Sequence, residues 1–223
     1  MGTMIQLTAS DGHHLAAYRA DPQQGAARGG VVVIQEIFGV NSHIRAVTDG
    51  FAADGYVAVA PAMFDRVERG IDIGYTADTI AKGRELRAGV ALDDAMRDVA
   101  AAVEAASGKG KVGLVGYCWG GYVAWMAAAR VGGLAAVVSY YGGGVIESAS
   151  EQPRCPVMLH FGERDSISPP EGIRAFRAAQ PAAAVHVYEA DHGFNCDQRG
   201  SHHKPSADLA RDRTVSFFRE HVG

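Results

Sequence analysis

The sequence predicts an α/β fold in which a mainly parallel sheet carries helices on both faces. Short runs rich in β-branched residues alternate with longer stretches of helical periodicity, and repeated strand–helix–strand units of this kind form parallel sheets. The short runs are apolar throughout, which is typical of strands covered on both faces. The expected strands are residues 31–35, 56–60, 112–115, 135–140, 157–161 and 185–188.

Two stretches show the clearest helical pattern. Residues 77–106 are expected to form one helix or more, because their apolar residues recur at spacings of four, three and four along one face. The final helix is expected to begin near Lys204-Pro205-Ser206, since proline and serine favour the first turn of a helix. The residues that mark the first of these faces are Leu92, Met96, Val99 and Val103.

The first 20 residues follow a different pattern from the rest of the chain. Residues 4–8 and 14–20 flank Ser10-Asp11-Gly12, and an Asp-Gly pair between two short runs indicates a hairpin turn. We therefore expect an antiparallel hairpin at one edge of the sheet, followed by the parallel strands.

Length and composition limit the classes of protein that this chain can be. It has 223 residues, 21 Lys and Arg against 25 Asp and Glu, and a net charge of −4. Hydrophobic residues make up 48% of the chain, which excludes a disordered protein. The absence of a basic excess argues against binding to nucleic acid. Residues 1–223 are expected to form one α/β domain.

The cysteines and the N-terminus indicate a reduced compartment. Cys118, Cys155 and Cys196 are separated by 37 and 41 residues, a spacing that fits neither a disulfide framework nor a zinc site. The N-terminal residues lack the pattern of a signal peptide, and no apolar run is long enough to span a membrane. We expect a cytoplasmic protein without a metal or cofactor and without a membrane partner, as a monomer or a small homo-oligomer.

One segment carries most of the functional information. An apolar strand runs into Gly116-Tyr117-Cys118-Trp119-Gly120-Gly121, and a helix is expected from about Tyr122 to Arg130. This is the G-x-S-x-G nucleophile elbow of α/β-hydrolases with cysteine in place of serine. Gly116 and Gly120 lack the Cβ atoms that would obstruct so sharp a turn. Cys118 would then lie at a helix N-terminus, where the helix dipole favours a thiolate.

An α/β-hydrolase needs an acid and then a histidine downstream of its nucleophile. Asp165 follows the strand at 157–161, and His192 follows the strand at 185–188, so the chain order is the required one. Glu163 and Asp191 are alternatives for the acid. Asp165 is preferred, because neighbours in sequence rarely place their side chains for a shared hydrogen bond.

Each of these groups has a defined chemical task. His192 would take the thiol proton and later protonate the leaving group, while Asp165 would fix the tautomer of the imidazole. The backbone N–H groups of Trp119 and Ile37 are expected to form the oxyanion hole. His43 is a weaker candidate for contact with substrate.

Four segments together resemble the dienelactone hydrolases (carboxymethylenebutenolidases), a cysteine branch of the α/β-hydrolases. They are GYCWGG, QEIFG, GERD and DHGF, and the resemblance covers nearly the whole chain. It implies a triad of Cys118, Asp165 and His192. It further implies that Glu36, after the early strand, contacts the thiol and helps to generate the thiolate when substrate arrives.

The chain departs from this family where substrate is held. Members of the family bind the substrate carboxylate with arginines, one of them shortly after the histidine, where this chain has Cys196. Arg199, three residues further on, is the candidate substitute. Tyr141 is a candidate for contact with substrate or for packing. For the second family arginine, only Arg66, Arg69 and Arg84 lie near the expected place.

The sequence therefore predicts a hydrolase that cleaves an ester or enol-lactone through a cysteinyl thioester, as in the degradation of aromatic compounds. A broader carboxylesterase or lactonase with the same triad is the alternative. A protein that only binds a small acid, or that senses oxidants through Cys118, is a further possibility. Loss of turnover on changing Cys118 to alanine would exclude both of these non-catalytic functions.

Overall fold

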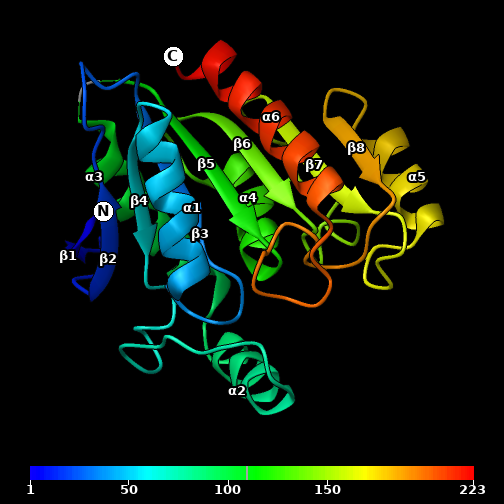
Figure 1. Ribbon diagram of the computed structural model, residues 1–223, viewed down its shortest axis with the longest axis horizontal. Coiled ribbons are helices and arrows are strands. Elements are labelled where there is room, and N and C mark those ends of the chain that lie inside the picture. The colour runs from blue at the N-terminus through cyan, green and yellow to red at the C-terminus, as the bar shows by residue number, and fades with distance from the viewer. Residues whose placement is uncertain (109) are drawn as a thin grey trace.

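The computed structural model describes residues 1–108 and 110–223, and these form an eight-stranded sheet between two layers of helices (Figure 1). The strand order is β1-β2-β4-β3-β5-β6-β7-β8, with β1 and β2 antiparallel and the strands from β4 to β8 parallel. The strands are β1 (Thr3–Thr8), β2 (His14–Ala20), β3 (Gly30–Ile34), β4 (Val57–Pro61), β5 (Val112–Tyr117), β6 (Leu134–Tyr140), β7 (Val157–Gly162) and β8 (Ala184–Tyr188).

These strands confirm the predicted fold class and the N-terminal hairpin. Each predicted strand occurs, and its ends lie within two residues of the expected ones. Short apolar runs rich in β-branched residues are typical of strands that are buried on both faces of a sheet. Strand β2 also pairs antiparallel with β4, which attaches the hairpin to the edge of the parallel sheet.

The helices divide between the two faces of the sheet. Helices α1 and α6 pack on one face through residues such as Phe51 and Phe218, while α3, α4 and α5 pack on the other through residues such as Val99, Val123 and Phe176. The helices are α1 (Ser42–Ala53), α2 (Ala77–Ala88), α3 (Leu92–Ser107), α4 (Trp119–Arg130), α5 (Pro170–Ala179) and α6 (Lys204–His221).

The structure refines two predictions about helices. The stretch predicted at 77–106 is two helices, α2 and α3, because the chain turns at Gly89. The helix after the elbow begins at Trp119 rather than near Tyr122, since Cys118 itself is the N-cap. Helix α2 stands beyond the carboxyl ends of the strands (Figure 1), where the loops of an open parallel sheet form binding sites.

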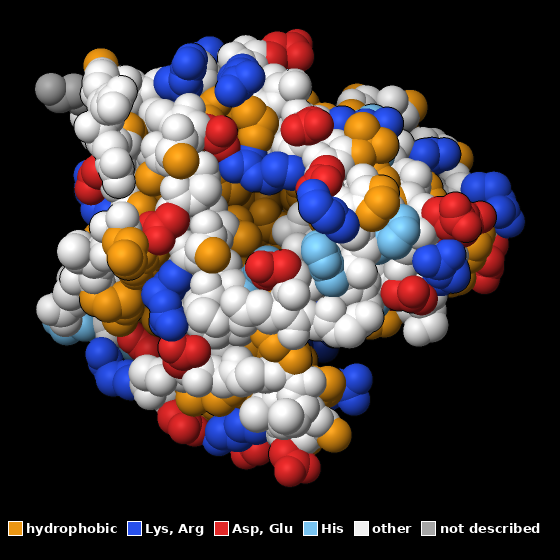
Figure 2. All heavy atoms as spheres, in the orientation of Figure 1, with side chains coloured by type: hydrophobic (Ala, Val, Ile, Leu, Met, Phe, Trp, Pro, Cys, Tyr) orange, Lys and Arg blue, Asp and Glu red, His pale blue; other side chains and the backbone are white. Residues whose placement is uncertain are grey.

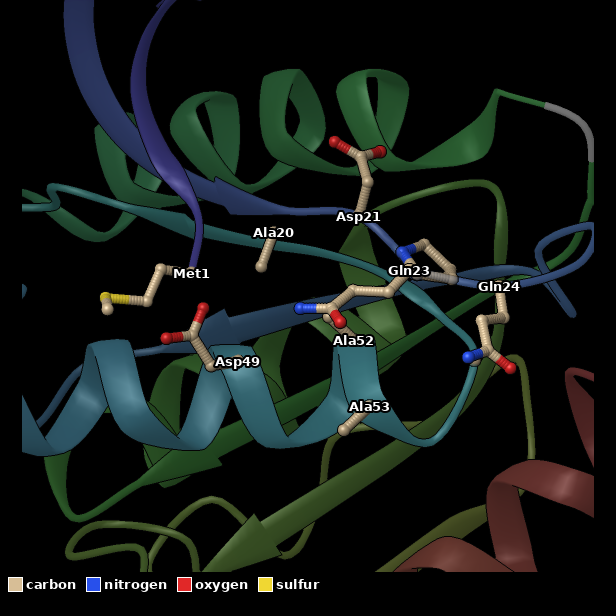
Figure 3. A pocket seen from close by; sticks show the side chains of 10 residues that line it. Met1, Ala20, Asp21, Gln23, Gln24, Asp49, Ala52 and Ala53 are labelled. Carbon is tan, nitrogen blue, oxygen red and sulfur yellow. The ribbon is translucent and has the colours of Figure 1, made fainter.

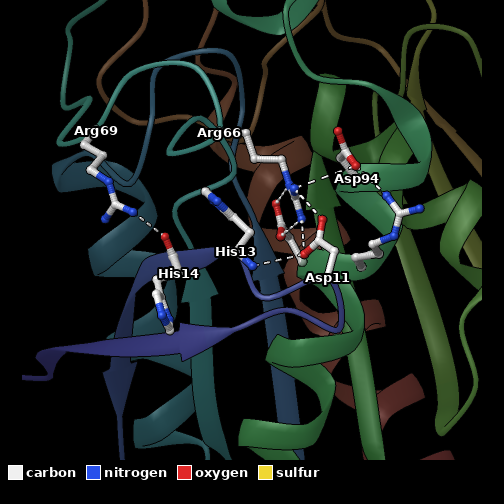
Figure 4. Close-up of polar contacts among 8 residues, drawn as sticks. Asp11, His13, His14, Arg66, Arg69 and Asp94 are labelled. Atoms are coloured by element: carbon white, nitrogen blue, oxygen red, sulfur yellow. Dashed lines mark hydrogen bonds and ion pairs between the residues drawn. The ribbon is translucent and has the colours of Figure 1, made fainter.

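Arg66 forms a cluster of ion pairs that joins the hairpin turn to α3 (Figure 4). Its guanidinium binds Asp11 at 2.8 Å and the buried carboxylate of Asp98 at 2.8 Å. Arg69 donates instead to the backbone oxygen of His14. Both arginines are therefore engaged with the hairpin region, which leaves Arg84 as the remaining candidate of the three for contact with substrate.

None of the helices in residues 1–108 and 110–223 is both long and apolar enough to cross a membrane. On the face that carries α1 and α6, Lys and Arg side chains are interspersed with Asp and Glu (Figure 2). This mixture agrees with the small net charge of −4.

Candidate active site

The carboxyl ends of the parallel strands bring the predicted residues to one edge of the sheet. Glu36 follows β3, Cys118 follows β5, Tyr141 follows β6 and Asp165 follows β7. His192 follows β8, so segments far apart in sequence converge on a single site.

Cys118 lies on a sharp turn between β5 and α4. Its backbone has φ 55° and ψ −116°, a conformation that residues other than glycine rarely adopt. A Cβ atom on Gly116 would lie 1.9 Å from the backbone oxygen of Gly120, and one on Gly120 would lie 2.4 Å from that of Gln35. Both glycines are therefore required by the close approach of backbone that holds the thiol at the helix N-terminus.

Cys118, His192 and Asp165 form a continuous chain of contacts. His192 Nε2 lies 3.1 Å from Cys118 Sγ, and His192 Nδ1 lies 2.8 Å from Asp165 Oδ2. Asp165 is buried, and its other oxygen accepts a hydrogen bond from the backbone N–H of Ile167 at 2.9 Å. The carboxylate is thus fixed from two sides, and its bond to Nδ1 orients the imidazole towards sulfur.

The two alternative acids lie elsewhere. Glu163 and Asp191 are both exposed, and the Asp191 carboxylate lies 3.5 Å from the guanidinium of Arg164. The geometry therefore favours Asp165 as the partner of His192.

His192 is electrostatically adapted to hold a proton. Burial of the ring lowers its pKa, but the hydrogen bonds to Asp165 and Cys118 and the negative charge of these groups outweigh burial and raise the pKa of His192 to about 10. The folded protein therefore holds this proton in place at neutral pH. An imidazolium at this position stabilises a thiolate at Sγ and can protonate a departing oxygen.

This raised pKa predicts the alkaline limb of the pH profile. The pKa of His192 is higher in the folded chain than its ordinary 6.5, so binding of this proton stabilises the folded state. That contribution to the free energy of unfolding is complete below about pH 6.5 and is lost as the pH rises through about 10. We expect kcat/KM for an ester to decline on the alkaline side with an apparent pKa near 10. A decline centred near 6.5 would contradict the assignment of the protonated imidazole.

Glu36 contacts an arginine rather than the thiol. Its Oε1 accepts a hydrogen bond from Arg199 Nη1 at 3.0 Å, and both side chains are largely buried. Its Oε2 is buried and has no hydrogen-bond partner among residues 1–108 and 110–223. Arg199 reaches Glu36 because the residue after His192 is Gly193, where a Cβ atom would lie 2.4 Å from Arg199 Nη1.

A cavity of about 420 Å³ opens beside Cys118 and His192. Ile37 and Trp119, the predicted oxyanion residues, line it, and Trp119 begins α4, where a backbone N–H has no partner within the helix. Tyr141 does not line this cavity: it is fully buried at φ 39°, with its ring 5.2 Å from that of His192. Tyr141 therefore supports the imidazole by packing.

The sequence did not single out several residues that line this cavity. Arg87 of α2 is one of them, and it lies in the cavity wall with Arg199 and with Arg84, which was one of the three arginines named from the sequence. The guanidinium groups of Arg84, Arg87 and Arg199 together give one side of the cavity a positive charge. The other residues not singled out for this role are Phe38, Ile80, Gly143, Gly144, Glu147 and Ile167.

A second cavity, of about 380 Å³, lies at the N-terminus beside α1 (Figure 3). Its wall includes Met1, Asp21, Gln23 and Asp49, and it contains none of the predicted catalytic residues. This cavity is therefore separate from the one at the carboxyl edge of the sheet, which Cys118 and His192 line.

Known proteins share both the sequence and the fold of this chain. The model of the dienelactone hydrolase family matches residues 15–222. Several relatives bear the name "Putative carboxymethylenebutenolidase". The one from Synechocystis sp. is 33% identical over 92% of this chain and 91% of its own length. The one from Azospirillum brasilense is 36% identical over 99% of this chain and its whole length.

The comparison of structures leads to the same family. The crystal structure titled as a putative dienelactone hydrolase from Klebsiella pneumoniae has a TM-score of 0.84 and 30% sequence identity, and the match covers 98% of this chain and 100% of that one. The family and the relatives' names indicate a hydrolase that acts on small-molecule esters or lactones. The chain belongs to the dienelactone hydrolase family.

Proposed function

We propose that the protein cleaves an ester or enol-lactone of a small carboxylic acid through a thioester on Cys118. The observation that carries this proposal is the alignment of Sγ, imidazole and buried carboxylate at 3.1 and 2.8 Å beside the cavity. These distances are those of a nucleophile, a base and the group that orients the base.

The reaction has two halves. The Cys118 thiolate attacks the carbonyl carbon, and the N–H groups of Trp119 and Ile37 stabilise the oxyanion. The carbon–oxygen bond then breaks, and His192 gives its proton to the departing oxygen. In the second half, water attacks the thioester while His192 takes a proton from it, which releases the carboxylic acid and restores the thiolate.

Glu36 and Arg199 couple substrate binding to activation of the thiol. An anionic substrate that binds the Arg199 guanidinium competes with Glu36 for it, because both offer carboxylate oxygens to the same donors. Once released, the Glu36 carboxylate accepts the Sγ proton where the thiol is still protonated, and it gives this proton up to solvent when the product leaves and Glu36 pairs with Arg199 again. The enzyme would thus be most reactive when a substrate occupies the cavity.

Replacing Glu36 with glutamine tests this role. The amide oxygen still accepts a hydrogen bond from Arg199 but cannot take up a proton, so we expect kcat/KM for an anionic ester to fall about 100-fold. The midpoint of thermal unfolding should shift by only a few degrees. Unchanged kcat/KM in Glu36→Gln would defeat the proposed role.

The arginines of α2 test the class of substrate. Arg84 and Arg87 are exposed at the cavity wall and form no ion pair among residues 1–108 and 110–223, so a substrate carboxylate is a suitable partner for them. We expect the double variant Arg84→Gln/Arg87→Gln to raise KM for a dienelactone about tenfold. The KM of an uncharged ester of the same size should stay the same, as the matched control.

The absorbance of a dienelactone follows the reaction directly. Loss of absorbance with the protein, and slower loss with the arginine variant, would support the carboxylate-bearing substrate. An equal effect of the arginine variant on charged and uncharged esters would favour the broader carboxylesterase instead. Oxidation of Cys118 without turnover of any ester would favour a redox-sensing thiol.

A further inference from the structure

Three further side chains with metal-binding atoms lie together at the start of α1. They are His43 of α1 and the adjacent Cys196 and Asp197 of the segment that follows His192. One ligand atom from each lies within 4.8 Å of the other two. We propose that His43, Cys196 and Asp197 bind one divalent cation of the Zn²⁺ class, at a site separate from the catalytic thiol.

The chemistry of the three ligands fits this class of ion. Thiolate, imidazole and carboxylate are the ligands of zinc in proteins, and thiolate in particular disfavours Mg²⁺ and Ca²⁺. Metal–ligand distances of about 2.0–2.3 Å place the ligand atoms of a tetrahedral site roughly 3.3–3.7 Å apart. Three protein ligands would leave a fourth position to water.

Two of the three proposed ligands are held in place by burial, and the third is exposed and can move. Cys196 is fully buried and the side chain of His43 is only 4% exposed, so their positions are set by packing. The side chain of Asp197 is 64% exposed, so its carboxylate can turn to shorten the ligand distances and offers the ion a path from solvent.

The imidazole of His43 already faces a carboxylate of the cluster. Its Nδ1 lies 3.0 Å from Asp197 Oδ1, so imidazole and carboxylate already adjoin. Nδ1 is therefore the nitrogen that this geometry offers to an ion, while Nε2, on the opposite side of the ring, has no hydrogen-bond partner within the described ranges 1–108 and 110–223.

The site joins α1 to the segment that carries the cavity arginine. The backbone N–H of Arg199 donates to the backbone oxygen of Cys196 at 3.1 Å, and Ser42 donates to Gln198 at 2.8 Å. Because the charge of Arg199 is offset by Glu36, the arginine does not exclude a cation from the neighbouring ligands. Ser42–Gln198 and His43–Asp197 already link α1 to this segment, so a bound ion would add a third link between α1 and the wall of the active site.

Cadmium is the probe, because a Cd²⁺–thiolate bond has its own ultraviolet charge-transfer band. The parent protein is Cys118→Ser/Cys155→Ser, in which Cys196 is the remaining cysteine, so that the catalytic thiol cannot give the signal. We expect one equivalent of Cd²⁺ to produce the band, Zn²⁺ to displace it and Mg²⁺ to leave it unchanged. Adding Cys196→Ser to the parent should abolish the band.

The variant Asp197→Asn, made in the parent protein, distinguishes a site with three protein ligands from binding of Cd²⁺ by the Cys196 thiol alone. This side chain is exposed, so the variant should fold normally, and we expect its Kd for Cd²⁺ to rise about tenfold or more. Zn²⁺ should also raise the Tm of the parent, but not that of the Cys196→Ser variant. Absence of the band, or an unchanged Kd in both Asp197→Asn and His43→Gln, would overturn the proposal.

Discussion

Replacing Cys118 with alanine is expected to abolish ester hydrolysis while leaving the fold intact. The thiol is the only group placed to form a covalent bond with substrate in the proposed mechanism, and removal of a nucleophile from a triad typically costs about 10⁴-fold or more in kcat. The Cys118 side chain is partly exposed at the cavity, so the change removes little packing. Steady-state kinetics with a chromogenic ester, together with a thermal unfolding curve, measure the two effects.

Cys155→Ala is the matched control for this variant. Cys155 is also a partly exposed free thiol, but it precedes β7 at the opposite end from the catalytic groups. We expect its kcat to equal that of the unchanged protein. Residual activity of Cys118→Ala at more than a few per cent would show that hydrolysis does not pass through this thiol.

Replacing Asp165 with asparagine should have the second-largest effect. An amide can donate a hydrogen bond to His192 Nδ1, which places the imidazole proton on Nε2 permanently and prevents uptake of a proton there. We expect kcat to fall roughly 10²–10⁴-fold. The buried position of Asp165 accommodates the nearly isosteric asparagine, so KM should change little.

The neighbouring carboxylates supply the controls for Asp165. Glu163→Gln and Asp191→Asn remove the alternative acids, and both residues are exposed. Neither variant should change kcat, and the alkaline limb of the pH profile should move to lower pH only in Asp165→Asn, because the raised pKa of His192 depends on that carboxylate. A loss of kcat in Asp191→Asn as large as that in Asp165→Asn would show that Asp165 is not the only carboxylate that orients His192, and would contradict the assignment.

Local sequence patterns were sufficient to predict the α/β sheet and to bring Cys118, His192 and Asp165 to the same edge of it. Each strand is a short buried run, and each of these residues lies within four residues of the carboxyl end of a strand, so their meeting at one edge follows from the parallel arrangement. Gly116 and Gly120 identified the elbow because their lack of Cβ atoms is required by the turn itself.

The wall of the cavity depends on tertiary structure and was less predictable. The pairing of Arg199 with Glu36 joins residues 163 positions apart in sequence, through a loop whose path is not set by periodicity. Helix α2 lies beyond the sheet, and nothing in its own sequence states which of its arginines face the site. The cluster at His43 was missed for the same reason, because its ligands come from two distant segments.

Trapping the acyl group tests the central claim most directly. The protein is mixed with a slowly hydrolysed ester, quenched in acid within the first turnover, digested and analysed by peptide mass spectrometry. The account predicts the added mass of the acyl group on the peptide that contains Cys118, and its loss on treatment with hydroxylamine, which cleaves thioesters. An acyl group on another residue, or hydrolysis during the first turnover without any acylated peptide, would contradict it.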